Sequence, residues 1–145
     1  MRAPSNNEVV KGVNVSGFIG DTNTQANIKI APTGSACTAW ESKATPLCGL
    51  VGEIQFVDSW ASSSTASSGI SVDSQGGGVI DGINLVAVQS VNNYSNGIEV
   101  LGNRTRNVRI VSPVVGYNNQ GNVNKHGIEI GPGVSGWSVI GGCAG

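Results

Sequence analysis

The sequence predicts an all-β solenoid, a parallel β-helix in which each coil of about 28–30 residues rests on the coil before it. Three observations favour this fold class. One phrase, Gly-Ile followed by a polar and then a branched aliphatic residue, recurs at 69–72, 97–100 and 127–130. Apolar and polar residues alternate within the strand-type segments, as half-buried strands require. Helix-type periodicity is nearly absent, and glycine, which suits tight turns, makes up 22 of the 145 residues.

The N-terminal third is less regular than the remainder. We expect residues 1–60 to form irregular coils with a surface loop at about 31–48, because that stretch contains Pro32, Gly34 and Pro46. Segments of strand type occur at 17–19, 27–30, 49–51 and 53–57. Their register relative to the later repeats is not evident from the sequence.

Residues 61–145 are expected to form regular coils. After each Gly-Ile phrase comes a polar, Gly-rich corner and then a second strand-type segment, at 83–86, 108–111 and 137–140. An Asn-rich corner follows in two copies, at 92–94 and 117–119. Alignment of the last two units places Gly145 opposite Gly116. We therefore expect the sequence to stop within a coil, as a fragment of a longer polypeptide would.

Alternation within the segments predicts which side chains form the core. Glu99 and Glu129 are expected to point outward. Asn93 and Asn118 align at the Asn-rich corner, which predicts a ladder of side-chain amides that joins consecutive coils. The side chains expected to point inward are Ile98, Val100, Ile110, Ile128, Ile130 and Val139.

Composition and charge exclude several classes of partner. Eight basic and nine acidic residues give a net charge of −1, without the basic stripe that nucleic-acid binding needs. No apolar run is long enough to span a membrane. The three cysteines, Cys37, Cys48 and Cys143, lack a CxxC spacing, so reduced thiols are expected, with a bridge between Cys37 and Cys48 as the alternative.

Several segments together resemble a known family. The run 97–100, the segment 107–110, the pair Asn118-Asn119 and the restart at 126–128 resemble right-handed, pectate-lyase-like β-helices. Within that family, they and the closing segment 137–145 are most similar to bacteriophage tailspike and tail-fibre proteins. The resemblance covers about residues 69–145. It implies a right-handed, single-stranded parallel β-helix that forms a homotrimer on the virion tail and binds, and often cleaves, a bacterial surface polysaccharide.

Cleavage of a polysaccharide requires two carboxylates, and Glu99 and Glu129 are the first candidates. They occupy the same place in consecutive repeats, so stacking would separate them by about 4.8 Å, close to the roughly 5–5.5 Å of retaining glycosidases. One alternative is a role at a subunit interface. Another is a surface ion-pair ladder, for which the available cations are Arg104, Arg106, Arg109 and Lys125.

Asp73 and Asp81 are further catalytic candidates. They lie at corners on either side of the glycine run 76–78. The alternative for both is a structural role, because short Asp side chains commonly cap turns.

Four residues are candidates for contact with a sugar. Asp58 precedes Trp60 by two positions, which would place an acid and an aromatic ring beside a sugar; the alternative is a turn next to a packed indole. Trp137 is a second aromatic candidate. Arg109 is expected to face outward on the neighbouring strand, and it would neutralise a uronate if the reaction were that of a lyase.

Other types of site are disfavoured. His126 is the single histidine, so a multi-histidine metal site is excluded and a corner role is favoured over acid–base chemistry. The glycine run 76–78 lacks the Lys-Ser/Thr and helix of a phosphate loop. Glu99 and Glu129 are too few ligands for calcium. We therefore expect neither a cofactor nor a metal.

Three hypotheses of function follow. The first is a tailspike-type segment that recognises bacterial surface polysaccharide, with or without depolymerase activity. The second is a non-catalytic structural β-helix of a tail fibre or baseplate. The third is a secreted, monomeric polysaccharide-active enzyme of pectate-lyase type. The first two locate the protein on the virion tail.

Overall fold

The computed structural model describes residues 9–34 and 49–144, which form strands and turns without a helix. The strands make three sheets, and neighbouring strands within each sheet are parallel. Sheet A contains β1 (Val9–Ser16), β4 (Leu50–Val57), β7 (Val79–Val86), β10 (Thr105–Val111) and β13 (Ser138–Ile140). Sheet B contains β2 (Ile19–Asp21), β5 (Trp60–Ser62), β8 (Gln89–Val91), β11 (Val114–Gly116) and β14 (Cys143–Ala144). Sheet C contains β3 (Ile28–Ile30), β6 (Ile70–Asp73), β9 (Ile98–Leu101) and β12 (Ile128–Ile130).

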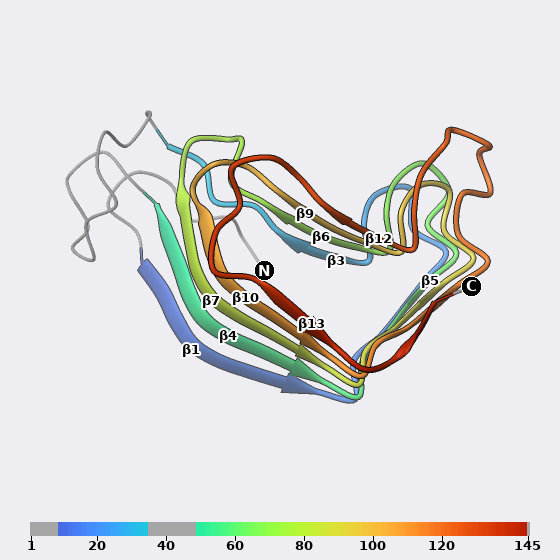
Figure 1. The fold of residues 1–145 in the computed structure, drawn as a ribbon, viewed down its shortest axis with the longest axis horizontal. Helices are drawn as coiled ribbons and strands as arrows, with labels where there is room; N and C mark the ends of the chain where they lie inside the picture. The colour runs from blue at the N-terminus through green and yellow to red at the C-terminus, as the bar shows by residue number, and fades with distance from the viewer. Residues whose placement is uncertain (1–8, 35–48, 145) are drawn as a thin grey trace.

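The chain visits the three sheets in turn. The strands β1, β2 and β3 lie in sheets A, B and C, the chain then returns to sheet A with β4, and this order continues to β14 (Figure 1). Each return adds a strand beside the one before it, so segments far apart in the sequence become neighbours. These stacked parallel strands are consistent with the solenoid that the sequence predicts.

Strand pairing confirms the alignment of the repeated phrases. Ile98 lies opposite Ile70 on one side and opposite Ile128 on the other. The second segments also align as predicted, because Val108 lies opposite Ile83, and Arg109 lies opposite Ser138.

The predicted unit of two strands is incomplete. Each repeat also passes through a short strand of sheet B, such as β8 or β11, which are three residues long. A segment of this length shows no measurable periodicity, so the alternation of residues that reveals the strands of sheets A and C does not reveal sheet B.

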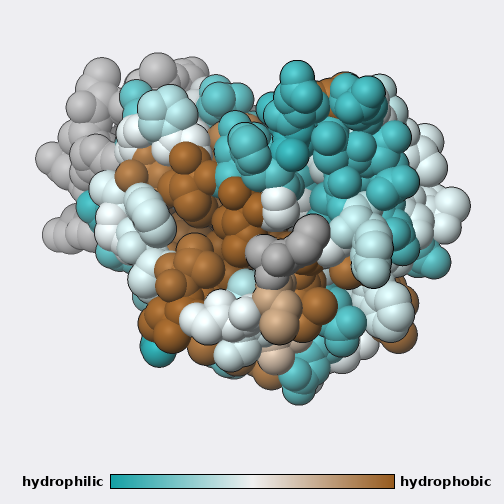
Figure 2. All heavy atoms as spheres, turned by 45° about the vertical axis from the view of Figure 1, so that its right-hand side comes forward, coloured by the Kyte–Doolittle hydropathy of each residue, from teal (hydrophilic) through white to brown (hydrophobic). Residues whose placement is uncertain are grey.

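Inward-pointing side chains fill the space between the sheets. Ile98, Val100 and Ile110 are fully buried, as predicted. Ile128 and Ile130 are half-buried against the same core. Val139 differs from the prediction: it lies opposite Ile110 but is 40% exposed, because β13 is the outermost strand of sheet A. Apolar side chains gather at this end of the stack (Figure 2).

The turn from sheet A to sheet B uses left-handed backbone in every repeat. The residue that follows each sheet A strand has φ between 48° and 64°. Non-glycine residues adopt this conformation at a cost of about 1–2 kcal/mol. The five residues are Gly17, Asp58, Ala87, Ser112 and Gly141.

The Asn ladder predicted at the corner between sheets B and C is present. Asn93 is fully buried and donates from Nδ2 to Asn118 Oδ1 at 2.9 Å. Its own Oδ1 accepts from the Ser64 backbone N–H at 3.0 Å. Asn118 Nδ2 donates in turn to the Ser90 carbonyl at 2.9 Å. The ladder therefore ties together the corners of three consecutive repeats.

This ladder explains the glycine of the repeated phrase. A Cβ added at Gly69 would lie 2.5 Å from Asn93 Nδ2, and one added at Gly97 would lie 2.6 Å from Asn118 Nδ2. Both distances are far below an ordinary van der Waals contact. Positions 69 and 97 of the phrase require glycine because the amide of the next repeat occupies the space of a side chain, together with Ser90 Oγ at position 69 and the Gly127 carbonyl at position 97.

Some predictions fall outside the described residues. The expected loop at 31–48 lies mostly within 35–48, as do Trp40, Cys37 and Cys48, and these residues are not described. Cys143 is an exposed free thiol. In the described part of the chain, no helix is long and apolar enough to cross a membrane.

Candidate functional site

The outer face of sheet C holds three of the four predicted catalytic carboxylates. Glu99 on β9 lies directly opposite Glu129 on β12. On β6, Ser71 lies opposite Glu99 of β9, and Asp73, two residues further along β6, lies opposite Leu101. Because alternate residues of a strand share a face, Asp73 is a diagonal neighbour of Glu99. All three carboxylates are half-buried, and adjacent strands lie about 4.8 Å apart.

One amide joins the two glutamates. Asn96 is fully buried, and its Nδ2 donates to Glu129 Oε2 at 2.6 Å and to Glu99 Oε2 at 3.4 Å. Ser68 Oγ donates to the same Glu99 oxygen at 2.8 Å. The orientation of the Asn96 amide is fixed by a further hydrogen bond, because the His126 backbone N–H donates to its Oδ1 at 2.8 Å. The carboxylates are thus held side by side as hydrogen-bond acceptors.

One of the four cations expected near this pair contacts it. Lys125 Nζ lies 3.5 Å from Glu129 Oε2, and the two residues are four positions apart in the chain. Arg106 instead pairs with Asp81 on sheet A, and Arg104 donates to the Gly77 carbonyl at 3.1 Å. Arg109 is exposed on sheet A, between Asn84 and Ser138. The predicted ion-pair ladder is therefore limited to Lys125 and Glu129 among the described contacts.

The long corner at 117–127 stands beside the start of the sheet C strands (Figure 1). Tyr117 is 78% exposed and Tyr94 is 38% exposed. The ring of Tyr94 packs against Gly121, where an added Cβ would lie 2.5 Å from its Cε2. Exposed polar side chains continue along the corner at Asn122, Asn124, Lys125 and His126. The corners that lead into sheet C therefore carry exposed aromatic rings and amides, and the strands that follow carry the two carboxylates.

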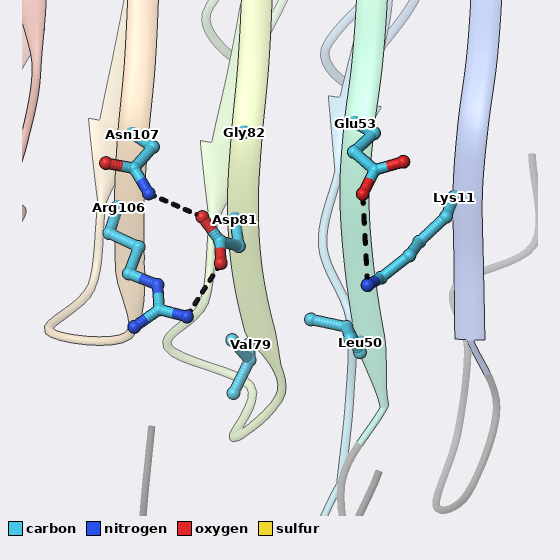
Figure 3. Close-up of a pocket in the computed structure, with 8 residues that line it drawn as sticks. All are labelled: Lys11, Leu50, Glu53, Val79, Asp81, Gly82, Arg106 and Asn107. Carbon is cyan, nitrogen blue, oxygen red and sulfur yellow. Dashed lines mark hydrogen bonds and ion pairs between the residues drawn. The ribbon is translucent and has the colours of Figure 1, made fainter. Parts of the chain in front are cut away.

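Asp81 lies apart from the other three carboxylates. It is on sheet A, where it lines a pocket of about 160 Å³ (Figure 3). Arg106 Nη2 and Asn107 Nδ2 each donate to its carboxylate at 2.7 Å. Partial burial raises the pKa of Asp81, but the hydrogen bonds from Arg106 and Asn107 and the charge of Arg106 outweigh it, so the pKa lies below its ordinary value.

A second carboxylate of this pocket, Glu53, is not evident from sequence reasoning. Its side chain is 70% exposed, and its Oε1 lies 4.0 Å from Lys11 Nζ. Its φ is 54°, within a column of left-handed residues that crosses sheet A. The signal that reveals it is alignment with glycines of the neighbouring strands. The column consists of Gly12, Glu53, Gly82, Asn107 and Gly136.

The four predicted sugar-contact residues do not gather around Glu99 and Glu129. Trp60 is 43% exposed on sheet B, between Ile19 and Gln89. Asp58 occupies the left-handed turn just before it, with φ 48°. Trp137 is 51% exposed and precedes β13 in sheet A, the sheet that also holds Arg109. These residues belong to sheets A and B and to the turn between them.

Comparisons with known proteins supply no relative, because no family model, curated protein or solved structure matches this chain. Within residues 9–34 and 49–144, no group of three or more His, Cys, Asp or Glu side chains is placed to hold a metal ion.

Proposed function

We propose that this chain is a segment of a right-handed parallel β-helix with coils of about 28–30 residues, of the tailspike type, and that it recognises a bacterial surface polysaccharide. Its place would be the virion tail, and its natural state would be a homotrimer. Support comes from the stacked parallel sheets and from the resemblance of residues 69–145 to that family. The surface we assign to recognition is the outer face of sheet C with the corner at 117–127.

The observation that carries this proposal is the pair Glu99–Glu129 held by Asn96. Two carboxylates in register on adjacent strands present parallel acceptors, which suit the neighbouring hydroxyl groups of a sugar. Tyr117 and Tyr94 are exposed on the corners that lead into the sheet C strands, and rings of this kind offer apolar area with a polar tip. Sugar rings combine an apolar C–H face with polar edges, so this combination of side chains matches both.

Hydrolysis by the same pair is a stronger claim, and the contacts favour binding over it. A general acid must donate a proton to the leaving oxygen. In the structure, Glu99 and Glu129 accept hydrogen bonds from Asn96, Ser68 and Lys125. This arrangement suits carboxylates that receive hydrogen bonds from sugar hydroxyls.

The test is binding of the full chain to a panel of bacterial capsules and lipopolysaccharides, with Glu99→Gln, Glu129→Gln and Tyr117→Ala. Each variant should bind at least about tenfold more weakly, the equivalent of about 1.4 kcal/mol. Asp21→Asn, an exposed acid-to-amide change on sheet B, is the matched control and should bind as the wild type does. Wild-type affinity in all three sheet C variants would contradict the proposal.

Product analysis on the same samples separates recognition from cleavage. New reducing ends that disappear in Glu99→Gln or Glu129→Gln would assign hydrolysis to the pair, and ultraviolet absorbance from unsaturated sugars would indicate a lyase instead. Binding without products would assign recognition alone.

A structural spacer is the second candidate function. The observation that favours it is that Asn93, Asn118 and Asn96 all join one repeat to the next, which stiffens the stack without any ligand. Absence of binding to every glycan in the panel, together with a trimeric mass in sedimentation, would select this alternative.

A further inference from the structure

The pocket on sheet A combines an apolar floor with a polar rim. Its floor is formed by Leu50 and Val79, which are 6% and 5% exposed and contact each other as a small separate core. The rim carries charged and amide side chains from four neighbouring strands, which converge on the same hollow (Figure 3). These rim residues are Lys11, Glu53, Asp81, Arg106 and Asn107.

Two separate polar groups border the hollow. On one side, Lys11 and Glu53 lie 4.0 Å apart, a loose contact between side chains that are 41% and 70% exposed. On the other side, Arg106 and Asn107 hold Asp81 in place with contacts of 2.7 Å. One wall is therefore fixed, and the other is able to adjust to a ligand.

Glu53 is an unusual residue type for a left-handed position within a strand. Three of the five residues in its left-handed column are glycine, and Asn107 belongs to a residue type that tolerates this backbone. A glutamate has no such tolerance, so its backbone is strained. Left-handed residues such as Ala87 also occur at the turns after the sheet A strands, but Glu53 lies inside β4, and strain of this kind is found at ligand-binding positions. The strain places a carboxylate on the pocket rim, opposite Asp81.

We infer that this pocket binds one neutral hexose residue, with Glu53 and Asp81 as acceptors for its hydroxyl groups; the inference rests on the proposed recognition of polysaccharide. Leu50 and Val79 would contact the C–H face of the ring, and Lys11 and Asn107 would donate to its oxygens. The pocket is lined by two cations and two carboxylates, so its charges balance. A balanced rim gives no net attraction to a uronate, which selects the neutral sugar.

The test uses backbone amide NMR spectra of the full chain, titrated with methyl glycosides of glucose, galactose and mannose and with methyl glucuronide. At least one neutral glycoside should shift the amide signals of 50–53 and 79–82, and the glucuronide should not. Glu53→Gln, which keeps the backbone strain, should weaken this binding by about tenfold. Glu53→Gly should abolish the binding and raise Tm, because glycine relieves the strain. Ala87→Gly, at another left-handed position outside the pocket, should leave binding unchanged.

Three results would overturn the inference: no shift at the pocket with any neutral glycoside, equal binding of the glucuronide, or unchanged affinity in both Glu53 variants while they remain folded. These results are distinct from failure of the proposed function. A polysaccharide that shifts signals of 98–101 and 128–130 but not those of the pocket would leave recognition by sheet C standing and remove only this subsite.

Discussion

The Gly69→Ala substitution should destabilise the protein by displacing the side chain of Asn93. A Cβ at position 69 would lie 2.2 Å from Ser90 Oγ, 2.5 Å from Asn93 Nδ2 and 2.9 Å from Asn93 Cγ, so neither side chain can stay where it is. In its native place the amide donates to the Ala61 carbonyl at 3.3 Å and to Asn118 Oδ1 at 2.9 Å, and it accepts from the Ser64 N–H. All of these contacts are lost if the amide moves.

The expected magnitude follows from the groups left without partners. A buried polar group that loses its hydrogen bond costs about 1–3 kcal/mol. We therefore expect Gly69→Ala and Asn93→Ala each to lower the free energy of unfolding by about 2–4 kcal/mol. In the double mutant, the Asn93 amide no longer opposes the methyl group added at position 69, and only the contact of that group with Ser90 Oγ remains. The double mutant should therefore be more stable than the sum of the single effects predicts, by about 1–3 kcal/mol.

Urea denaturation followed by circular dichroism and tryptophan fluorescence measures these differences, provided that the two transitions coincide. Gly17→Ala is the control, because no described atom lies within 4 Å of an added Cβ there and only its positive φ opposes alanine. It should show no coupling with Asn93→Ala. Strict additivity between Gly69→Ala and Asn93→Ala would refute the packing of the ladder onto this glycine.

Three further predictions concern single residues. Replacement of a buried isoleucine by alanine lowers the free energy of unfolding by about 2–5 kcal/mol. In urea titrations, Ile98→Ala should fall near the upper end of this range and Ile128→Ala near the lower end, because Ile98 is fully buried and Ile128 is half-buried. Equal effects would contradict this. Ala87→Gly should stabilise by about 0.5–1 kcal/mol and raise Tm, since φ at Ala87 is 51°. The pKa of Asp81 is lower in the folded state, so its stabilisation is present at neutral pH and is lost as the pH falls from about 3.9 through the folded value. Asp81→Asn should therefore be less stable than wild type at neutral pH and equal to it in strong acid, and an undiminished difference in acid would refute this.

The repeated phrase is enough to predict how the strands of sheet C are aligned. Ile70, Ile98 and Ile128 stack in register because each follows a glycine at the same corner. Each also occupies a position that faces the core when the residues of its strand alternate between the two faces of the sheet. The same reasoning locates the pair Glu99–Glu129, since residues at equal places in successive repeats must become neighbours. The Asn ladder follows for the same reason.

The sequence is less informative where the position of a residue depends on the path between strands. Asp73 and Asp81 are eight positions apart and flank the same glycine run, yet they belong to sheets C and A. The direction in which the chain leaves a corner depends on backbone angles of residues that carry no periodic signal. The short strands of sheet B are missed for this reason too.

Repetition in the sequence is enough to align the stacked strands and to predict the Glu99–Glu129 pair. Which unlike residues of different repeats share a surface depends on the tertiary fold. Lys11, Glu53, Asp81 and Arg106 come from four strands of sheet A and meet at one pocket. Periodicity predicts that like residues at equal places in successive repeats become neighbours. The mixed pocket depends instead on how the left-handed residues inside β1, β4, β7 and β10 orient the side chains around them.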